Sequence, residues 1–538
     1  ISTMSETSHR FILNNHLWQL GHKLNLLYSV FLSMYLLSNK TFVCLATTQT
    51  NLFDMDVACY QGKIMSLCIS GLSDQWLKTQ KIMVEVSSDH PLIKLMNALD
   101  WEGLCDVVLP DLKRSTGRLK WWLGRKLKVR THLGVFLLQQ LLNETDRGIE
   151  RQIRDNAVYA VFCGKTFVDN WKVPDHTKIE EFRSRLSPET QCALANALTQ
   201  LAVKKGFANP GHIDIDSTVQ IPDMQYPATV NLLVKAAAVG RRIQKILMRT
   251  MPDVVKEHIP DIDMKAIKGV AKQHYFEKRK ELKKKMEARK IALVKLWSAV
   301  SEAIQPMIRF ARIIDEPFIL DSLPVRDKNL ITQFIRKAPA LLTETFDRCY
   351  DNASRHSKIF SFHRNAVDCF NKNKHHKGLE FGRQFQIGRV GGNFVYSIPN
   401  NSIRMPDAAS FKPMLTHHIE LFQTPIKSMG TDKGYYSKDN EKLALDFSVK
   451  QVAVQRPNRK LKDPPDNPIT PEQLELLENR RAGIEPIIGH LKKSWQMGRS
   501  RMKSDTTTEA SGYCAMLGFN LKQLMRYLTG EAVVIAPG

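Results

Sequence analysis

A stretch near the carboxyl end, residues 480–503 (RRAGIEPIIGHLKKSWQMGRSRMK), constrains the fold more than any other part of the chain. On an α-helix with about 100° per residue, Arg481, Glu485 and Lys492 fall within roughly 40° of one another. Four apolar residues follow the i, i+3, i+4, i+7 pattern of a buried stripe on a neighbouring face: Ile484, Ile487, Ile488 and Leu491. The pattern predicts a buried helix that presents one carboxylate between two cations. A surface ion pair on an ordinary amphipathic helix remains an alternative.

Pro486 lies inside this predicted helix. A proline removes a backbone donor, clashes with the preceding turn and biases the residue before it away from helical dihedral angles. Gly483 nearby would ease a bend. We therefore expect the helix to kink or restart close to Glu485.

Composition limits the class of protein. A chain of 538 residues with 43% hydrophobic residues predicts two or three folded domains. A formal net charge of +24 and a pI near 9.6 predict a polyanionic partner, with ribosomal, membrane-surface and nucleic-acid-enzyme classes all open on charge alone. Nine cysteines without a CxxC pair favour a reducing cytosol over a zinc ribbon or disulfide framework. The apolar run 24–37 is shorter than a membrane-spanning helix, so no membrane partner is expected.

Two further stretches place an aspartate at a strand or its end. HIDIDSTVQ, residues 212–220, alternates in the manner of a strand and carries Asp214 and Asp216 on the same face. SMGTDKGYYS predicts a strand that ends near Asp432, with Gly434 permitting a tight turn directly after it. A turn aspartate without a catalytic role is the alternative for Asp432. Asp214 could support Asp216 from behind.

The remaining pattern predicts an order of elements. Residues 91–186 and 240–375 are expected to be helical. Residues 277–295 predict a charge-dense helix with a thin apolar stripe, either solvated and coiled-coil-like or in contact with DNA; the stripe consists of Leu282, Met286 and Ile291. A hairpin is expected over 380–398, helices over 408–421 and from Pro471 toward Trp495, and a strand at 450–455. The basic stretch 111–130 contains Lys120, Trp121, Arg125 and Lys126, which suit a nucleic-acid surface or, alternatively, a solvated loop with core tryptophans.

The spacing Arg481, three residues, Glu485, six residues, Lys492 resembles the glutamate signature of DDE transposases of bacterial insertion sequences, and IEPIIGHLK resembles one branch of them. That signature usually has a tyrosine three residues before the arginine, where this chain has Glu478. The setting of Asp216, followed by Ser, Thr and Val, resembles the first acid of the family.

Other segments carry the same resemblance. Asp432, followed by glycine and tyrosine two and three residues later, resembles the second acid, and YPATVNLL after residue 225 resembles the same branch. PDHTKIEEFRSRL, residues 174–186, resembles the amino-terminal helical domain that is thought to recognise element ends. The resemblance runs through residues 85–530 as ordered pieces.

The resemblance implies an α/β (α+β) ribonuclease-H-like core with a helical insertion, preceded by an all-α amino-terminal DNA-binding domain. The expected domains are 76–205, which binds DNA, and 206–530, which is catalytic and carries an insertion at about 240–375. Residues 1–75 are expected to be an extension, part of it non-native, with an uncertain start site. The setting implied is the bacterial cytoplasm, with a homodimer acting on double-stranded DNA.

The implied chemistry is two-metal phosphoryl transfer. Mg²⁺, or Mn²⁺ as a substitute, prefers oxygen ligands, so Asp216 would bridge two ions while Asp432 and Glu485 each complete one. Arg481 and Lys492 would hold phosphates. The expected function is cleavage of insertion-sequence ends and joining of the 3′ hydroxyl to target DNA. A hydrolytic nuclease of the same fold and a catalytically silent, transposase-derived DNA-binding protein are the rivals.

Overall fold

A computed structural model describes residues 64–69, 82–112, 122–165, 173–277, 282–314, 323–350, 358–374, 377–399, 402–454 and 470–532. The chain divides into two compact units. The first contains residues 1–209, 392–394 and 517–538, and the second contains residues 210–391 and 395–516. The division falls within strand β3, Asn209–Gln220. The predicted domain bounds at 205 and 206 stay a prediction.

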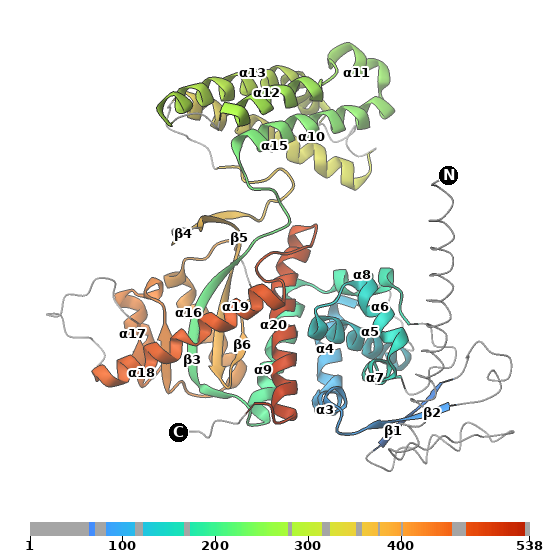
Figure 1. The fold of residues 1–538 in the computed structure, drawn as a ribbon, viewed down its shortest axis with the longest axis vertical. Helices are drawn as coiled ribbons and strands as arrows, with labels where there is room; N and C mark the ends of the chain where they lie inside the picture. The colour runs from blue at the N-terminus through green and yellow to red at the C-terminus, as the bar shows by residue number, and fades with distance from the viewer. Residues whose placement is uncertain are drawn as a thin grey trace, which may run out of the picture. The chain divides into compact units, whose positions relative to one another are not determined.

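The first unit is built mainly from helices (Figure 1). These are α3 Pro91–Ala98, α4 Trp101–Leu112, α5 Trp122–Leu142, α6 Asp146–Asp155, α7 Ala157–Phe162, α8 His176–Arg185 and α9 Pro188–Lys204. Side-chain caps start several of them, for example Thr145 before α6, Asp175 before α8 and Ser187 before α9. The helical pattern predicted for 91–186 is therefore confirmed where the structure describes it.

A strand pair precedes these helices. Strands β1 Ile64–Ile69 and β2 Ile82–Ser87 pair in antiparallel fashion. In β2, Ile82, Val84 and Val86 alternate with Glu85 and Ser87, a pattern that favours a strand over a helix. Because β2 lies inside the range predicted to be all-α, that range is not wholly helical.

The second unit is organised around a mixed sheet. Its strands are β3, β4 Asp368–Lys374, β5 Lys377–Gly391, β6 Phe394–Tyr396, β7 Ser428–Thr431 and β8 Gln451–Ala453. The order is β4-β5-β3-β7-β8, with β6 paired to β5. Strand β7 runs parallel to both β3 and β8. The strands predicted before Asp432 and at 450–455 are confirmed.

The predicted hairpin is confirmed as β5 and β6. Gly392 and Asn393 join the two strands with φ values of +91° and +62°. Two consecutive residues with positive φ match the hairpin turns that follow the twist of antiparallel strands, and glycine and asparagine tolerate that geometry best. The turn lies one residue later than the Gly391–Gly392 pair expected from the sequence.

Helices connect and follow the sheet strands. They are α16 Asp407–Phe422, α17 Lys438–Asp446, α18 Pro471–Ala482, α19 Ile484–Ser494 and α20 Asp505–Leu528. The predicted interruption near Glu485 is confirmed, because α18 ends at Ala482 and α19 begins after Gly483. Ile484, Ile487 and Leu491 are buried, as the stripe predicted, whereas Ile488 is half-buried.

A helical insertion separates β3 from β4 (Figure 1). It contains α10 Thr229–Thr250, α11 Pro252–His258, α12 Met264–Glu277, α13 Leu282–Ile314 and α15 Val325–Cys349, which share one apolar core. The segment Glu287–Phe310 of α13 is long and apolar enough to cross a membrane, yet Leu296, Val300 and Ile304 belong to that core, and core helices pass the same test. Ile291, predicted to lie in an apolar stripe, is exposed.

Candidate active site

Two of the predicted acids lie at the same edge of the sheet. In the parallel pairing of β3 with β7, Ile215 stands opposite Thr431. Asp216 and Asp432 are the next residue on each strand or just beyond it. Because β7 ends opposite Ile215 while β3 continues to Gln220, this register brings the two aspartates together from distant parts of the sequence.

The environment of Asp216 works against its charged form. Burial raises the pKa of Asp216 to about 6, and the negative charges of Asp432 and Asp407 add to this rise. The Ser217 amide, which donates to Asp216 Oδ1 at 2.7 Å, and the positive charge of Arg481 lower the pKa in part. Burial and two nearby carboxylates therefore disfavour the charged form of Asp216, and a bound cation would favour it.

Arg481 connects the other two predicted acids. Its Nη1 lies 3.6 Å from Asp432 Oδ1, and its Nη2 lies 3.2 Å from Glu485 Oε1. The Arg481 side chain is 20% exposed, whereas Asp432 and Glu485 are 55% and 65% exposed. One half-buried guanidinium thus lies between two solvent-facing carboxylates, and the charges of Arg481 and Asp432 both act on Asp216. The catalytic roles of Asp216, Asp432 and Glu485 stay predictions.

Lys492 takes a different partner. Its Nζ lies 3.9 Å from Glu380 Oε2 on β5, and the Lys492 side chain is 31% exposed. Lys492 lies on α19, about two turns after Glu485. The sequence pattern placed one carboxylate between Arg481 and Lys492, but in the structure each cation is paired with its own acid.

Asp407 is a fourth carboxylate that sequence reasoning missed. It is the first residue of α16, and its Oδ1 accepts a hydrogen bond from Gln384 Nε2 at 2.8 Å. Its charge raises the pKa of Asp216 and also that of Tyr435, whose pKa is raised mainly by burial. The sequence around it, MPDAAS, indicates only the start of a helix, so no local signal marked Asp407 as part of the site.

A buried network beneath the site fixes the helix that carries Arg481. Asp214 is 2% exposed and accepts hydrogen bonds from Arg389 Nε and Nη2, at 3.1 and 2.7 Å, and from Arg480 Nε and Nη2, at 3.1 and 3.0 Å. Arg389 Nη2 also donates to the carbonyl of Arg480 at 2.7 Å. Asp214 therefore supports the site by joining β3 and β5 to the end of α18, as a paired and hydrogen-bonded buried charge.

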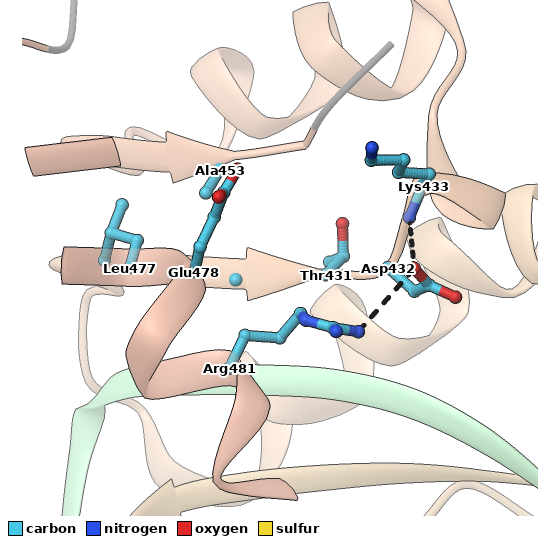
Figure 2. A pocket seen from close by; sticks show the side chains of 8 residues that line it. Thr431, Asp432, Lys433, Ala453, Leu477, Glu478 and Arg481 are labelled. Atoms are coloured by element: carbon cyan, nitrogen blue, oxygen red, sulfur yellow. Dashed lines mark hydrogen bonds and ion pairs between the residues drawn. The ribbon is translucent and has the colours of Figure 1, made fainter. Parts of the chain in front are cut away.

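A cavity of about 160 Å³ opens beside Asp432, at the ends of β7 and β8 (Figure 2). Arg481 reaches across it toward Asp432, and Lys433 lies at the same end. The Thr431 hydroxyl lines the cavity and is buried without a hydrogen-bond partner. Glu478, which stands at the tyrosine position of the signature that the sequence resembles, also lines the cavity and adds another carboxylate.

The donor set suits a magnesium ion only in part. Among the residues that the structure describes, no group of three or more His, Cys, Asp or Glu side chains is arranged to hold a metal ion as it stands. Magnesium, however, is commonly bound by one or two carboxylates, with water and substrate phosphate completing its coordination. Asp216 and Asp432 meet that requirement, whereas Glu485 would first have to leave Arg481.

The predicted DNA-binding residues of the first unit cannot be placed in the same way. Lys120 and Trp121 lie outside the described residues, as do the side chains of Arg125 and Lys126 on α5. Their predicted role therefore stays a prediction.

Comparison with known proteins gives one match. Residues 80–185 match the family described as Transposase domain (DUF772). No curated protein and no solved structure matches the chain. The match supports a transposase family and suggests an enzyme of transposition. It covers helices α3 to α8 of the first unit, but neither α9 nor the acidic site.

Proposed function

We propose that the chain is a DDE-type DNA transposase that cleaves the ends of an insertion sequence and joins the freed 3′ hydroxyl to target DNA. The observation that carries this proposal is the convergence of Asp216, within β3, and Asp432, at the end of the neighbouring parallel strand β7, with Arg481 joining Asp432 to Glu485. The transposase-domain match in residues 80–185 supports it independently, from the other unit of the chain.

The strand order supports a ribonuclease-H-like core. The path β6-β5-β3-β7-β8 puts a hairpin on one side of β3 and two strands parallel to it on the other. Helices α16 and α17 precede β7 and β8, and α18 and α19 follow. In this proposal the first acid lies on the central strand, the second after β7 and the third on a later helix. The helical insertion interrupts the core between β3 and β4.

Asp216 and Asp432 would hold Mg²⁺, or Mn²⁺ in its place, and Glu485 would join them once Arg481 releases it. Such an ion, when bound, supplies the Lewis acidity that in-line displacement at a phosphate needs. Asp407 adds negative charge near Asp216, which favours cation binding over an empty site. Both cleavage by water and attack by the 3′ hydroxyl would use this locus.

Arg481 would exchange its partners during this cycle. Without a divalent ion, its guanidinium offsets the charges of Asp432 and Glu485. When a metal takes over the carboxylates, the guanidinium is released to a DNA phosphate, which it can bind in bidentate fashion. Lys492, near Glu380 on the next turns of α19, would contact the same DNA strand through a point charge.

Cleavage of a labelled DNA fragment that carries the end of the encoding element, in magnesium, tests the proposal. We expect the unaltered protein to cut at the end, and Glu485→Gln or Asp216→Asn to lower the rate by about a hundredfold or more, because a lost metal ligand removes several kcal/mol of transition-state stabilisation. Glu475→Gln is the matched control, since Glu475 is an exposed acid of α18 outside the site. Equal cutting by all four proteins would refute the assignment.

The two rivals give different outcomes. A hydrolytic nuclease would cut but fail to join a pre-cut 3′ end to a second duplex. A silent DNA-binding protein would bind the end and cut at no magnesium concentration. The specific observations in favour of the silent protein are the ion pair between Glu485 and Arg481 and the carboxylate of Glu478 at the tyrosine position. We further expect a homodimer on DNA, which the mass of the protein–DNA complex would report.

A further inference from the structure

The helical insertion carries a groove whose chemistry differs from that of the acidic site. It lies between α10 and α12 and has a volume of about 820 Å³. Its lining combines six cations, a polar edge and an apolar floor: Lys235, Arg241, Arg242, Lys245, Lys268 and Lys272; Gln225, Asn231 and Tyr275; Val234, Ala238, Met264 and Ala271. No carboxylate is among these lining residues. The groove is therefore a concentrated positive surface.

Helical periodicity explains how the cations collect there. On α10 the lining positions recur from 234 and 235 through 238, 241 and 242 to 245, and on α12 they recur from 264 through 268 and 271 to 275. Residues at these spacings share one face of a helix, so the two helices turn their basic faces toward the same groove. Alanine and valine on the floor leave room for a ligand to approach closely.

The charge of Arg241 acts on one acid, Asp263, whose pKa is lowered mainly by backbone hydrogen bonds and further by this charge. Two observations show that the groove nonetheless keeps a positive character. Arg241 Nε is buried and has no hydrogen-bond partner. The pKa of His363 is lowered, first by partial burial and then by the positive charges of Lys235, Lys337, Arg242 and Arg364. Groove cations thus add to a positive field that reaches as far as the loop before β4. A polyanion would lower the cost of holding these like charges together.

The dimensions favour a polymer over a single phosphate. Lys235 and Lys245 are ten residues apart on α10, which corresponds to about 15 Å along the helix axis. One strand of duplex DNA carries a charge about every 3.4 Å of axis, so this distance matches roughly four successive phosphates. Tyr275, which is 46% exposed and donates to Asn231 Oδ1, adds a polar edge to one end of the row.

We propose that this groove binds the sugar–phosphate backbone of duplex DNA, independently of sequence, as a second DNA contact beside the acidic site. The proposal rests on the proposed function, in which the same protein must hold DNA while Asp216, Asp432 and Glu485 act on it. It assigns the insertion a direct part in substrate binding. Backbone contacts of this kind position a duplex without reading its bases.

Salt-dependent binding of a duplex of arbitrary sequence, measured in EDTA, tests the groove without any catalytic step. The triple variant Lys245→Gln, Lys268→Gln, Lys272→Gln removes three exposed groove charges. The control Arg249→Gln, Lys256→Gln, Lys265→Gln removes three exposed charges of the same insertion that do not line the groove. Each lost phosphate contact lowers the slope of log K against log salt by about 0.9. We expect the slope to fall by about 2 to 3 for the groove variant, and its affinity to fall at least tenfold below that of the control.

Equal slopes and affinities for the two triple variants would overturn the proposal. Replacement of the same three lysines by arginine keeps the charge and should restore binding, which separates a lost contact from a misfolded insertion. The proposal would also be overturned if the groove variant lost binding to single-stranded RNA but kept its binding to duplex DNA, because the groove would then bind a different partner. A protein that cuts DNA but fails the groove test refutes this inference alone, whereas one that passes it but never cuts refutes only the proposed function.

Discussion

Asp214 and Asp216 are two residues apart on one face of β3 but have opposite environments. Asp214 is buried, and two arginines satisfy its carboxylate. Asp216 accepts a hydrogen bond from the Ser217 amide, but burial, together with the nearby charges of Asp432 and Asp407, raises its pKa to about 6. A structural acid and a reactive acid thus differ through their neighbours. The raised pKa of Asp216 singles it out as the candidate reactive acid of the pair.

A second titratable residue with a buried environment, His418, lies away from the site and allows the effect of burial on a pKa to be tested. The ring lies on α16 with Nδ1 3.0 Å from Tyr396 Oη and Nε2 2.9 Å from the carbonyl of Pro210. A carbonyl can only accept, so Nε2 donates, and a neutral ring then accepts from the tyrosine at Nδ1. Burial is the main cause that lowers the pKa of His418 to about 4, and His417 contributes.

Because the folded-state pKa of His418 lies below the model-peptide value of 6.5, the unfolded chain binds the proton more strongly. The stability that neutral His418 contributes is complete above pH 6.5 and is lost as the pH falls toward 4. We expect His418→Gln, which can make both hydrogen bonds at any pH, to remove about 2 to 3 kcal/mol of this pH dependence. Urea unfolding at pH 7.5 and pH 4.5 measures it. The same pH dependence in both proteins would contradict the assignment.

The break between α18 and α19 is the element on which the site geometry depends most. Arg481 on one helix and Glu485 on the next form an ion pair across it, while Ile484, Ile487 and Leu491 stay buried. Gly483 makes the break possible, because a Cβ there would clash with Arg389 Nη1 and lie 3.0 Å from the carbonyl of Arg480. Arg389 is the same residue that holds Asp214, so this glycine is packed against the supporting network.

Alanine at two glycines of this region should therefore have opposite effects. Gly483→Ala displaces Arg389 from Asp214, and we expect it to destabilise the fold by about 1 to 3 kcal/mol, the range for overpacking. Gly489→Ala, in α19, meets nothing within 4 Å and should stabilise by up to about 1 kcal/mol through helix propensity. Thermal unfolding of both variants compares the same substitution at two places. Stabilisation by Gly483→Ala would show that Arg389 can move at no cost.

At the scale of the whole chain, segments far apart in the sequence complete each compact unit. The carboxyl-terminal residues from Leu517 belong to the first unit with residues 1–209, although the first half of α20 belongs to the second. Asn520 on α20 is fully buried, and its Nδ2 donates to the carbonyl of Ala195 at 3.0 Å and to Thr199 Oγ1 at 3.1 Å. The end of the chain thus helps to fix α9.

Asn520→Ala should loosen the first unit selectively. It leaves a buried carbonyl and hydroxyl with one donor fewer, at a cost of about 1 to 3 kcal/mol. We expect faster hydrogen–deuterium exchange in peptides of α9 and unchanged exchange in peptides of β7. Glu531→Ala, at an exposed residue after α20, serves as the control. Unchanged exchange in α9 would mean that Asn520 contributes nothing measurable to that unit.

Local pattern was sufficient for most elements of the second unit. The hairpin, α16, β7, β8 and the interrupted helix after Pro471 all follow from alternation, helical spacing and the positions of glycine and proline. The sequence also determined the candidate acids Asp216, Asp432 and Glu485, because spacing and turn chemistry are local. Two strands were missed: β2, and β4, which lies inside the range 240–375 that was expected to be helical. The exposed position of Ile291 was missed as well. Short or charge-rich segments do not specify which of their side chains are buried.

Tertiary structure alone decided which charges meet. The register between β3 and β7 places Asp216 near Asp432. Asp407, at the start of α16, lies close enough to raise the pKa of Asp216. Glu380 on β5 forms an ion pair with Lys492. Packing of α10 against α12 turned two separate sets of cations into one groove. Side-chain type and periodicity can be read from the sequence. The interaction energy of two charges depends on the distance between them in the folded chain, and local periodicity does not determine that distance.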